Sequence, residues 1–382
     1  MKRKSIFSVA VVLSILALFV LVAGTSAAPT NGGPDKMRFV AHTPGEAKRG
    51  IDRGCEVVKR GRALTVLHCD PRVGGELGLQ QDIRVYAQDT SVNSQIGANI
   101  VQSGGNTGAG RKIAVVDTGY NYNHPELSSS YLGGYDFVNN DTDPADDNGH
   151  GSHVAGIITA DGIVDVASKG AAPNAGVLAL KVLDASGSGF FSNVAEAIYF
   201  AVNGPDGVAS TSDDFGVDAI NMSLGTAQPY TYKGFCDSVL PSLTAAIQYA
   251  VNNGVAVVSA AGNSGNAGVS IPGCISYSTT VGAVDDFDKI ASFSGRGKAV
   301  DITAPGVTVY STWLGNSYLS ASGTSMATPA IAAVVALVKF AHPAYTQAQV
   351  ESALFSTAKD LGRVGKDVNY GWGRVRVDLA VQ

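Results

Sequence analysis

Charged residues are scarce in this chain. Only 15% of its 382 residues are Asp, Glu, Lys or Arg, and the formal net charge is −5. Proteins that bind a nucleic-acid backbone normally carry a strongly basic surface, so this composition argues against nucleic acid as a partner. Hydrophobic residues make up 45% of the chain, and there are 46 glycines. The sequence therefore predicts one large domain with a sizeable core and many tight turns, together with a second, small part of the chain.

Long apolar runs are also rare, and only one, at the N-terminus, approaches the length of a membrane span. The basic segment MKRK precedes this run, and Thr25 and Ala27 occupy the two small-residue positions of a signal-peptide cleavage site. An uncleaved anchor is the alternative, because about 20 apolar residues span a bilayer. We favour a cleaved signal peptide at residues 1–27, which predicts a secreted, extracellular protein with no membrane contact after its removal. The later run IAAVVALVKFA is too short to span and better suits a core helix.

Cysteine is limited to four residues. Cys55 and Cys69 lie near the N-terminus, whereas Cys236 and Cys274 lie far downstream. Four cysteines can pair in three ways, and we expect a disulfide within each couple. Free buried thiols are the alternative, which export into an oxidising compartment disfavours.

The chain changes character near residue 90. Residues 28 to about 90 contain short strand patterns and many Lys and Arg residues, which indicates a small basic module that holds little core of its own. From residue 111 onward, buried-strand patterns alternate with helical ones. The strand patterns are KIAVV, VLALKVL, VDAIN, VAVVSA and TTVGAV, and the helical ones are SNVAEAIYFAV, LPSLTAAIQYAVNN, SMATPAIAAVVALVKF and TQAQVESALFSTA. This alternation predicts an α/β fold, with a parallel sheet covered by helices on both faces and sites at the carboxyl ends of the strands.

Three motifs on this scaffold carry an acid, an imidazole and a hydroxyl. Asp117 ends the strand KIAVVD, His150 begins the small-residue helix of NGHGSHVAGI, and Ser325 begins the helix of GTSMATP. A serine nucleophile needs a base that takes its proton and a carboxylate that holds the base in one tautomer. Each residue by itself is more often a turn residue or a helix cap. Their joint occurrence within long motifs predicts a catalytic triad.

The motifs resemble those of the subtilase family of serine peptidases. The matching stretches lie between about residues 94 and 373 and are VVDTGYNYNHPEL, DDNGHGSHVAGI, GAAPNAGVLALKVLDASGSG, DAINMSLG, VVSAAGNSG, ITAPGV and SASGTSMATP. The order Asp, His, Ser is that of the family. The resemblance implies a three-layer subtilisin-like fold and a monomeric serine endopeptidase that hydrolyses polypeptides through an acyl-enzyme, without a catalytic cofactor.

The resemblance also implies a role for each site residue. Ser325 is expected to be the nucleophile, His150 the general base and then acid, and Asp117 the group that orients His150. Asn263, in AAGNSG, matches the family's side-chain donor to the oxyanion and is expected to act together with the backbone N–H of Ser325. His153 matches a second family histidine that is structural.

The substrate cleft is expected between two edge segments that hold a peptide as an added strand. Their residues are Gly187, Ser188 and Gly189 on one side and Ser223, Leu224 and Gly225 on the other. The pocket for P1, the residue before the scissile bond, is expected to be walled by Ala260, Ala261 and Gly262 and floored near residues 266–273. No carboxylate lies in that floor, so we expect an uncharged P1 residue, mainly apolar or aromatic.

One acidic segment has two interpretations. DFVNNDTDPADDNGH carries oxygen ligands at alternate positions, which suits Ca²⁺. It resembles the calcium loop of thermitase-like subtilases at Asp136, Asn139, Asp141 and Asp143. A solvated acidic loop is the alternative, and both stay open at this point. A second calcium loop of the family corresponds to ITADGIVDVASKG, which lacks the usual asparagines, so that site is doubtful here.

The N-terminal module resembles the propeptides that assist subtilase folding and then inhibit the enzyme. The resemblance implies a small α+β propeptide at residues 28–86 and a catalytic domain at residues 87–382. The cut is expected after Tyr86, with Ile83 in a second apolar pocket and Ala87 as the new N-terminus. Two other functions stay open: a catalytically silent subtilase fold used for binding, which the intact triad disfavours, and a serine esterase, which the peptide-binding edges disfavour.

Overall fold

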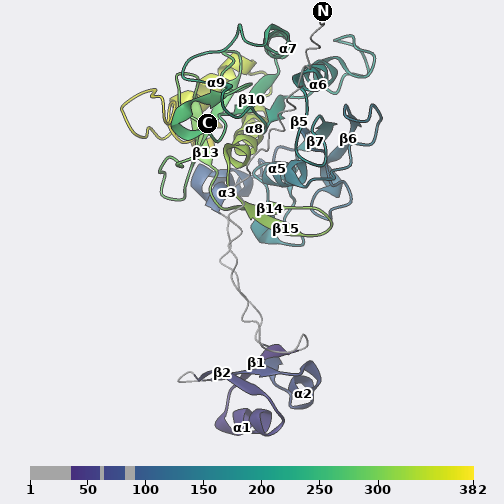
Figure 1. Cartoon of the computed structure of the whole chain (residues 1–382), viewed down its shortest axis with the longest axis vertical. Helices are drawn as coiled ribbons and strands as arrows, with labels where there is room; N and C mark the ends of the chain where they lie inside the picture. The colour runs from purple at the N-terminus through teal and green to yellow at the C-terminus, as the bar shows by residue number, and fades with distance from the viewer. Residues whose placement is uncertain (1–35, 61–63, 82–90) are drawn as a thin grey trace, which may run out of the picture. The chain divides into compact units, whose positions relative to one another are not determined.

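The computed structural model describes residues 36–60, 64–81 and 91–382, and it divides into two compact units, Met1–Ala87 and Gln88–Gln382 (Figure 1). The predicted signal peptide and the predicted cleavage site at Tyr86 both lie outside the described residues. So does Ile83. These expectations therefore stay predictions.

The described part of the N-terminal unit is an α+β module with a four-stranded antiparallel sheet in the order β2-β3-β1-β4. Helix α1 begins at a capping box, in which Thr43 and Glu46 bond each other's backbone N–H groups. A small core forms around Phe39 and Leu67. The elements are β1 (Met37–Ala41), α1 (Pro44–Asp52), β2 (Glu56–Arg60), β3 (Thr65–Cys69), α2 (Pro71–Glu76) and β4 (Gln80–Gln81).

The large unit is built on a parallel sheet. Within residues 91–382 this sheet has seven strands in the order β13-β12-β10-β8-β5-β7-β6, so β5 lies near its centre. The strands are β5 (Lys112–Asp117), β6 (Tyr131–Asp136), β7 (Gly176–Lys181), β8 (Ala219–Met222), β10 (Ala256–Ala260), β12 (Thr279–Val284) and β13 (Ile302–Pro305). Two short antiparallel pairs lie outside it, β9 (Thr231–Tyr232) with β11 (Val269–Ser270) and β14 (Val309–Thr312) with β15 (Tyr318–Ala321).

Helices cover both faces of this sheet, and the alternation of side chains along each strand explains why. Ile113 and Val115 of β5 belong to one buried cluster, and Ala114 and Val116 belong to the other. The first cluster includes α3 (Ser91–Ile96), α4 (Ala98–Ser103), α5 (His150–Thr159), α8 (Thr324–Ala341), α9 (Gln347–Ser356) and α10 (Val377–Ala380). The second includes α6 (Phe191–Asn203) and α7 (Pro241–Asn252). The predicted three-layer fold is confirmed.

Helix α8 runs through the core beside α5 and packs against several strands (Figure 1). Among the described residues it is the one helix that is long and apolar enough to cross a membrane, but 78% of it is buried inside the protein. It is therefore the core helix that the sequence predicted. The residue expected to be the nucleophile, Ser325, lies in its first turn.

Both predicted disulfides are present. Cys55 bonds Cys69 between the end of α1 and β3, and Cys236 bonds Cys274 in the large unit. Each bridge therefore closes a loop within its own region, as the positions of the cysteines in the sequence suggested.

Candidate active site

Asp117 and His150 meet at the carboxyl end of the central strand. Asp117 is the last residue of β5 and is fully buried, and its Oδ1 lies 2.7 Å from Nδ1 of His150, whose side chain is 14% exposed. The same Oδ1 accepts a hydrogen bond from the backbone N–H of Thr118 at 2.7 Å. Because a carboxylate can only accept, the Nδ1 atom of His150 carries a proton. The other ring nitrogen, Nε2, is then the basic atom in the neutral imidazole.

Burial and the neighbouring carboxylate have opposite effects on His150. Burial disfavours the imidazolium, but the charge of Asp117 and its hydrogen bond outweigh that effect and raise the pKa of His150. His153, one turn later, has no such partner, and burial lowers its pKa to about 4. Nε2 of His153 lies 2.9 Å from the carbonyl oxygen of Leu319 and 3.1 Å from that of Val309. A neutral, buried imidazole that joins two strands supports the structural role expected for His153.

Asp146 holds the first turn of α5, and sequence reasoning gave it no role. Its Oδ1 accepts hydrogen bonds from the N–H groups of Asn148 and Gly149, and its Oδ2 accepts from both N–H and hydroxyl of Ser152. Burial opposes ionisation of Asp146, but these bonds outweigh it and lower the pKa of the carboxyl. Such a capping carboxylate fixes where the helix, and hence His150, begins. The only sequence signal was an acidic residue just before a helix.

Ser325 is tied to the strand segment that follows β8. Its Oγ lies 3.0 Å from the carbonyl oxygen of Ser223, and the hydroxyl of Ser223 donates to the carbonyl oxygen of Ser325 at 2.9 Å. Asn221, on β8, in turn donates through its Nδ2 to the hydroxyl of Ser223 at 3.0 Å. The start of α8 is therefore fixed against one of the two segments that were expected to bind substrate.

The orientation of the Asn263 amide is fixed by Thr324. Oδ1 of Asn263 accepts from both the N–H and the hydroxyl of Thr324, each at 3.0 Å, and the hydroxyl accepts from the N–H of Gly262 at 3.1 Å. The amide Nδ2 therefore points the other way, toward Gly323. Because Asn263 is exposed, this N–H donor faces the surface beside the first turn of α8. Sequence reasoning identified Thr324 only as a small neighbour that lets a substrate backbone approach, and missed its role in orienting Asn263.

The predicted segments of the substrate cleft take up tight, glycine-dependent geometry. Gly187 has φ of 76°, and Oδ1 of Asp184 accepts from the N–H groups of Ser186 and Ser188 within the same turn. Gly189 returns to bridge Leu183. This first edge is therefore a compact loop at the carboxyl end of β7.

The other predicted segments meet at Ser270. A Cβ on Gly225 would lie 2.9 Å from Cβ of Ser270, and a Cβ on Gly262 would lie 1.8 Å from its Oγ. The hydroxyl of Ser270 donates to the carbonyl oxygen of Thr226 at 2.7 Å. Residues 223–225 and 260–262 thus approach the predicted floor so closely that only glycine fits on either side of Ser270. The side chains at this junction are uncharged.

The loop expected to bind calcium does not gather its carboxylates. Asp136 is buried, and both of its carboxylate oxygens accept hydrogen bonds from its own turn, at the N–H groups of Val138 and Asn139 and at Nδ2 of Asn139. Asp143 accepts instead from the hydroxyl of Tyr122, and Asp141 from the N–H of Asp143. Across the described ranges, no three His, Cys, Asp or Glu side chains lie close enough together to hold a metal ion. These contacts favour the acidic-loop interpretation, and a calcium site at Asp136, Asn139, Asp141 and Asp143 stays a prediction.

The loop that corresponds to the family's second calcium site is organised around the carboxylate of Glu126. Glu126 is fully buried, and its carboxylate accepts from the backbone N–H groups of Gly162, Val164 and Asp165 and from the hydroxyl of Tyr318. Ca²⁺ requires oxygen ligands, whereas these backbone groups present N–H donors to a carboxylate. The doubt raised by the missing asparagines therefore has a physical basis.

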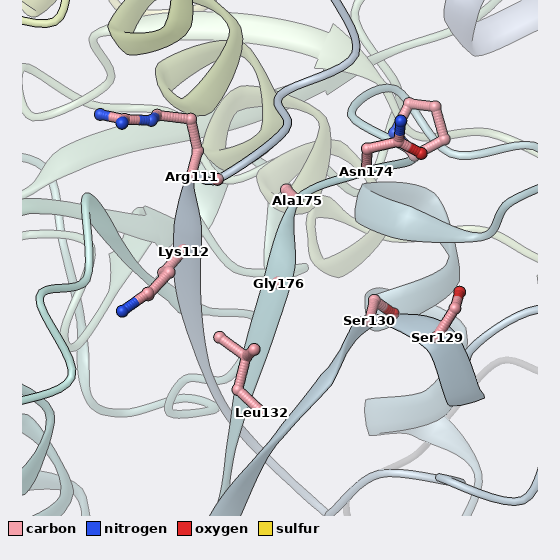
Figure 2. A pocket seen from close by; sticks show the side chains of 10 residues that line it. Arg111, Lys112, Ser129, Ser130, Leu132, Asn174, Ala175 and Gly176 are labelled. Atoms are coloured by element: carbon pink, nitrogen blue, oxygen red, sulfur yellow. The ribbon is translucent and has the colours of Figure 1, made fainter.

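One pocket of the large unit lies away from these residues. A pocket of about 320 Å³ opens at the amino ends of β5 and β7, and Figure 2 shows the side chains of Arg111 and Lys112 extending away from Ser129 and Ser130. The six residues of β5 separate this end from Asp117, a span of about 17 Å along the strand. The pocket is therefore not part of the candidate active site.

Comparison with known proteins shows the family to which the chain belongs. The model of the subtilase family matches residues 108–373, which is more than half of the chain. The chain belongs to the subtilase family. It is a subtilisin-like serine endopeptidase, a hydrolase that acts on polypeptides and needs no catalytic cofactor.

Individual subtilases are similar over most of the large unit. "Thermophilic serine proteinase" of Bacillus sp. (strain AK1) is 41% identical over 263 residues, which are 69% of this chain and 60% of that relative. Thermitase of Thermoactinomyces vulgaris is 39% identical over 72% of this chain and 90% of its own length. Subtilisin E of Bacillus subtilis is 38% identical over 78% of this chain and 72% of its own length. The first of these relatives thus extends well beyond the matched part.

Proposed function

We propose that Asp117, His150 and Ser325 form the catalytic triad of this peptidase. The observation that carries the proposal is the 2.7 Å contact between His150 Nδ1 and the buried carboxylate of Asp117, at the strand edge where α8 begins. His150 Nε2 takes the proton of the Ser325 hydroxyl as Oγ attacks the peptide carbonyl. His150 then gives that proton to the leaving amine. Water repeats the sequence on the acyl-enzyme and releases the second product.

The negative charge on the attacked carbonyl oxygen is stabilised by Asn263 and by the start of α8. Thr324 holds the amide so that Nδ2 is presented as a donor beside Ser325. The unpaired N–H groups in the first turn of a helix, including that of Ser325, and the positive end of its dipole favour an anion at this point. Both donors are fixed before the reaction begins, so little reorganisation is needed.

The substrate lies as an added strand between residues 187–189 and 223–225, held mainly by main-chain hydrogen bonds. Its P1 side chain enters between residues 223–225 and 260–262, toward Ser270. The surroundings of Ser270 are uncharged, which supports a preference for uncharged, apolar or aromatic P1 residues. Main-chain recognition supports broad specificity elsewhere along the peptide.

The enzyme is secreted as a precursor and matures by its own activity. The compact α+β unit that precedes the large unit supports a propeptide at residues 28–86, which acts as folding aid and inhibitor. The signal-like segment at residues 1–27 supports export, and the two disulfides fit an oxidising compartment. The mature enzyme is a monomer of residues 87–382. Calcium at residues 136–143 is not part of the proposal.

An organophosphonate probe tests this proposal and separates the alternatives. The mature enzyme should react with the probe at Ser325, found by peptide mapping, and should degrade casein. A silent binding protein would leave the probe unreacted. An esterase would react with the probe yet leave casein intact, and either result would contradict the proposed function.

A further inference from the structure

A buried lysine lies next to the catalytic aspartate and has no part in the mechanism above. Lys181 is the last residue of β7 and pairs in register with Asp117 at the end of β5. Its side chain is only 2% exposed. An ammonium group this deeply buried is costly unless each of its hydrogens finds an acceptor. Its partners therefore indicate what it does.

The ammonium group of Lys181 joins three segments. Nζ donates to the carbonyl oxygen of Thr118 at 2.6 Å, to Oδ1 of Asp147 at 2.6 Å and to the carbonyl oxygen of Leu183 at 2.9 Å. Three donors thus have three acceptors, one after β5, one in the loop before α5 and one after β7. Leu183 begins the turn that carries residues 187–189.

Thr118 connects this lysine to the triad. Its backbone N–H donates to Asp117 Oδ1, the same atom that contacts His150. Its hydroxyl donates to Asp146 at 2.9 Å and accepts from the N–H of Gly151, in the first turn of α5, at 2.8 Å. A lysine that fixes the carbonyl group of Thr118 therefore fixes a residue that contacts both Asp117 and the helix that carries His150.

We propose that Lys181 is a positioning residue for the Asp117–His150 pair. It fixes the carbonyl group of Thr118, and through the backbone of Thr118 the N–H that bonds Asp117, together with the path of the loop at Asp147, so that the carboxylate meets Nδ1 at hydrogen-bond distance. The inference rests on the proposed function, because it assigns a role within the same triad. Misplacement of a catalytic pair by about 1 Å can cost about a hundredfold in rate.

The carboxylates around Lys181 do not all depend on it equally. Asp136 of β6 is the register partner of Lys181, but its carboxylate bonds to its own turn. The pKa of Asp184 is lowered mainly by a hydrogen bond from the hydroxyl of Ser186. Asp147 is the direct ion-pair partner and is 50% exposed. The ion pair is thus partly solvated. The contacts of Lys181 with the backbone carbonyl groups of Thr118 and Leu183 do not involve this exposed carboxylate.

The test compares Lys181→Met with the matched control Lys112→Met. Lys112 lies at the opposite end of β5, and its Nζ also donates to a backbone carbonyl, that of Phe215, at 2.8 Å. The matured variants are assayed on a peptide p-nitroanilide, with circular dichroism and thermal unfolding as fold checks. We expect Lys181→Met to lower kcat at least about tenfold with KM within about threefold, and Lys112→Met to change neither beyond about twofold. The low-field proton resonance of the His150 Nδ1 hydrogen should shift or vanish in Lys181→Met only.

Two further variants keep the test decisive if Lys181→Met does not fold. Lys181→Arg keeps the positive charge but replaces the ammonium group by a planar guanidinium group. The retained charge should therefore not restore kcat, which should be lowered as in Lys181→Met. Asp147→Asn removes the ion pair and leaves both carbonyl contacts, so it should lower kcat less than Lys181→Arg does. A folded Lys181 variant with wild-type kcat, or one in which only KM rises, would overturn the inference. Failure of the proposed function differs, because wild-type protein would then either not react with the phosphonate probe or react with it and leave casein intact.

Discussion

The side chain of Asn263 accepts two hydrogen bonds from Thr324, one from the backbone N–H and one from the hydroxyl, each at 3.0 Å. Thr324 directly precedes Ser325, the proposed nucleophile, so the proposed oxyanion donor is oriented by the same helix turn that presents Ser325. Asn263→Ala should lower kcat by about 10² to 10³ with little change in KM, as known for the equivalent amide of subtilisin. Steady-state kinetics on a peptide substrate measure both values. An effect confined to KM would mean that Asn263 binds the ground state.

Thr324→Val tests whether that orientation matters. The valine keeps the volume and the backbone N–H but loses the hydroxyl that bonds Asn263 and Gly262. With one of its two anchors gone, the amide should sample the flipped orientation, and kcat should fall about tenfold, since a neutral hydrogen bond contributes about 1 kcal/mol. The double variant Thr324→Val/Asn263→Ala should lose no more kcat than Asn263→Ala alone. If the losses of the two single variants instead added up in the double variant, the two residues would act independently.

The raised pKa of His150 fixes the direction of the pH dependence. Only the neutral imidazole can take the serine proton, so kcat/KM should fall as pH drops through the pKa of His150. Because Asp117 raises that pKa, the fall should centre above pH about 6.5. Because the pKa of His150 is higher in the folded protein than in the unfolded chain, protonation of His150 stabilises the fold. This stabilisation is complete below the pKa of the unfolded chain and is lost as pH rises through the pKa of the folded protein. A pH–rate profile centred below pH 6 would contradict the account.

Ser270 should limit the size of the P1 residue. Its buried hydroxyl lies 1.8 Å from where a Cβ on Gly262 would be, at the junction of the two proposed walls of the P1 pocket. Ser270→Gly should therefore increase kcat/KM for Tyr relative to Ala at P1 by about tenfold, within the range that pocket size confers. A peptide series that differs only at P1 measures this ratio. An unchanged ratio would place the P1 side chain elsewhere.

Glu126 should stabilise its loop without metal. Glu126→Gln removes the charge from the four hydrogen bonds of that carboxylate and should lower the free energy of unfolding by about 1–3 kcal/mol. Glu196→Gln, at an exposed position of α6, is the matched control. Both are measured by urea unfolding in a Ser325→Ala background, which prevents self-digestion. If added calcium restored the stability of Glu126→Gln, the loop would be a metal site after all.

The sheet and its helices could be predicted because their signals are local. The buried strand of residues 112–117 and the long apolar helix that begins at Thr324 both have the period of their element. The three triad candidates could be predicted because each lies at the end of such an element. The 2.7 Å contact joins Asp117 at the end of β5 to His150 at the start of α5, and sites of this fold class are expected at the carboxyl ends of the strands.

The supporting residues could not be predicted, because their partners are far away in the sequence. Nothing near Lys181 indicates that its ammonium group bonds Thr118, and nothing near Glu126 indicates a loop that wraps it with N–H groups. The calcium expectation relied on alternating oxygen ligands, a pattern that does not state where each side chain points. Oδ1 of Asp136 accepts from the N–H groups of its own turn, a contact that the composition of the segment does not indicate, and the calcium site stays a prediction.

The most direct test is the N-terminus of the Ser325→Ala protein compared with that of wild type, by N-terminal sequencing and intact mass. The account predicts that wild-type protein begins near Ala87 and hydrolyses peptides. The folded variant should accumulate as a precursor that begins near Ala28 and should lose about 10⁶ in kcat, the loss known for subtilisin. A variant that matures by itself, or that keeps turnover within tenfold of wild type, would contradict the assignment of Ser325 as the nucleophile.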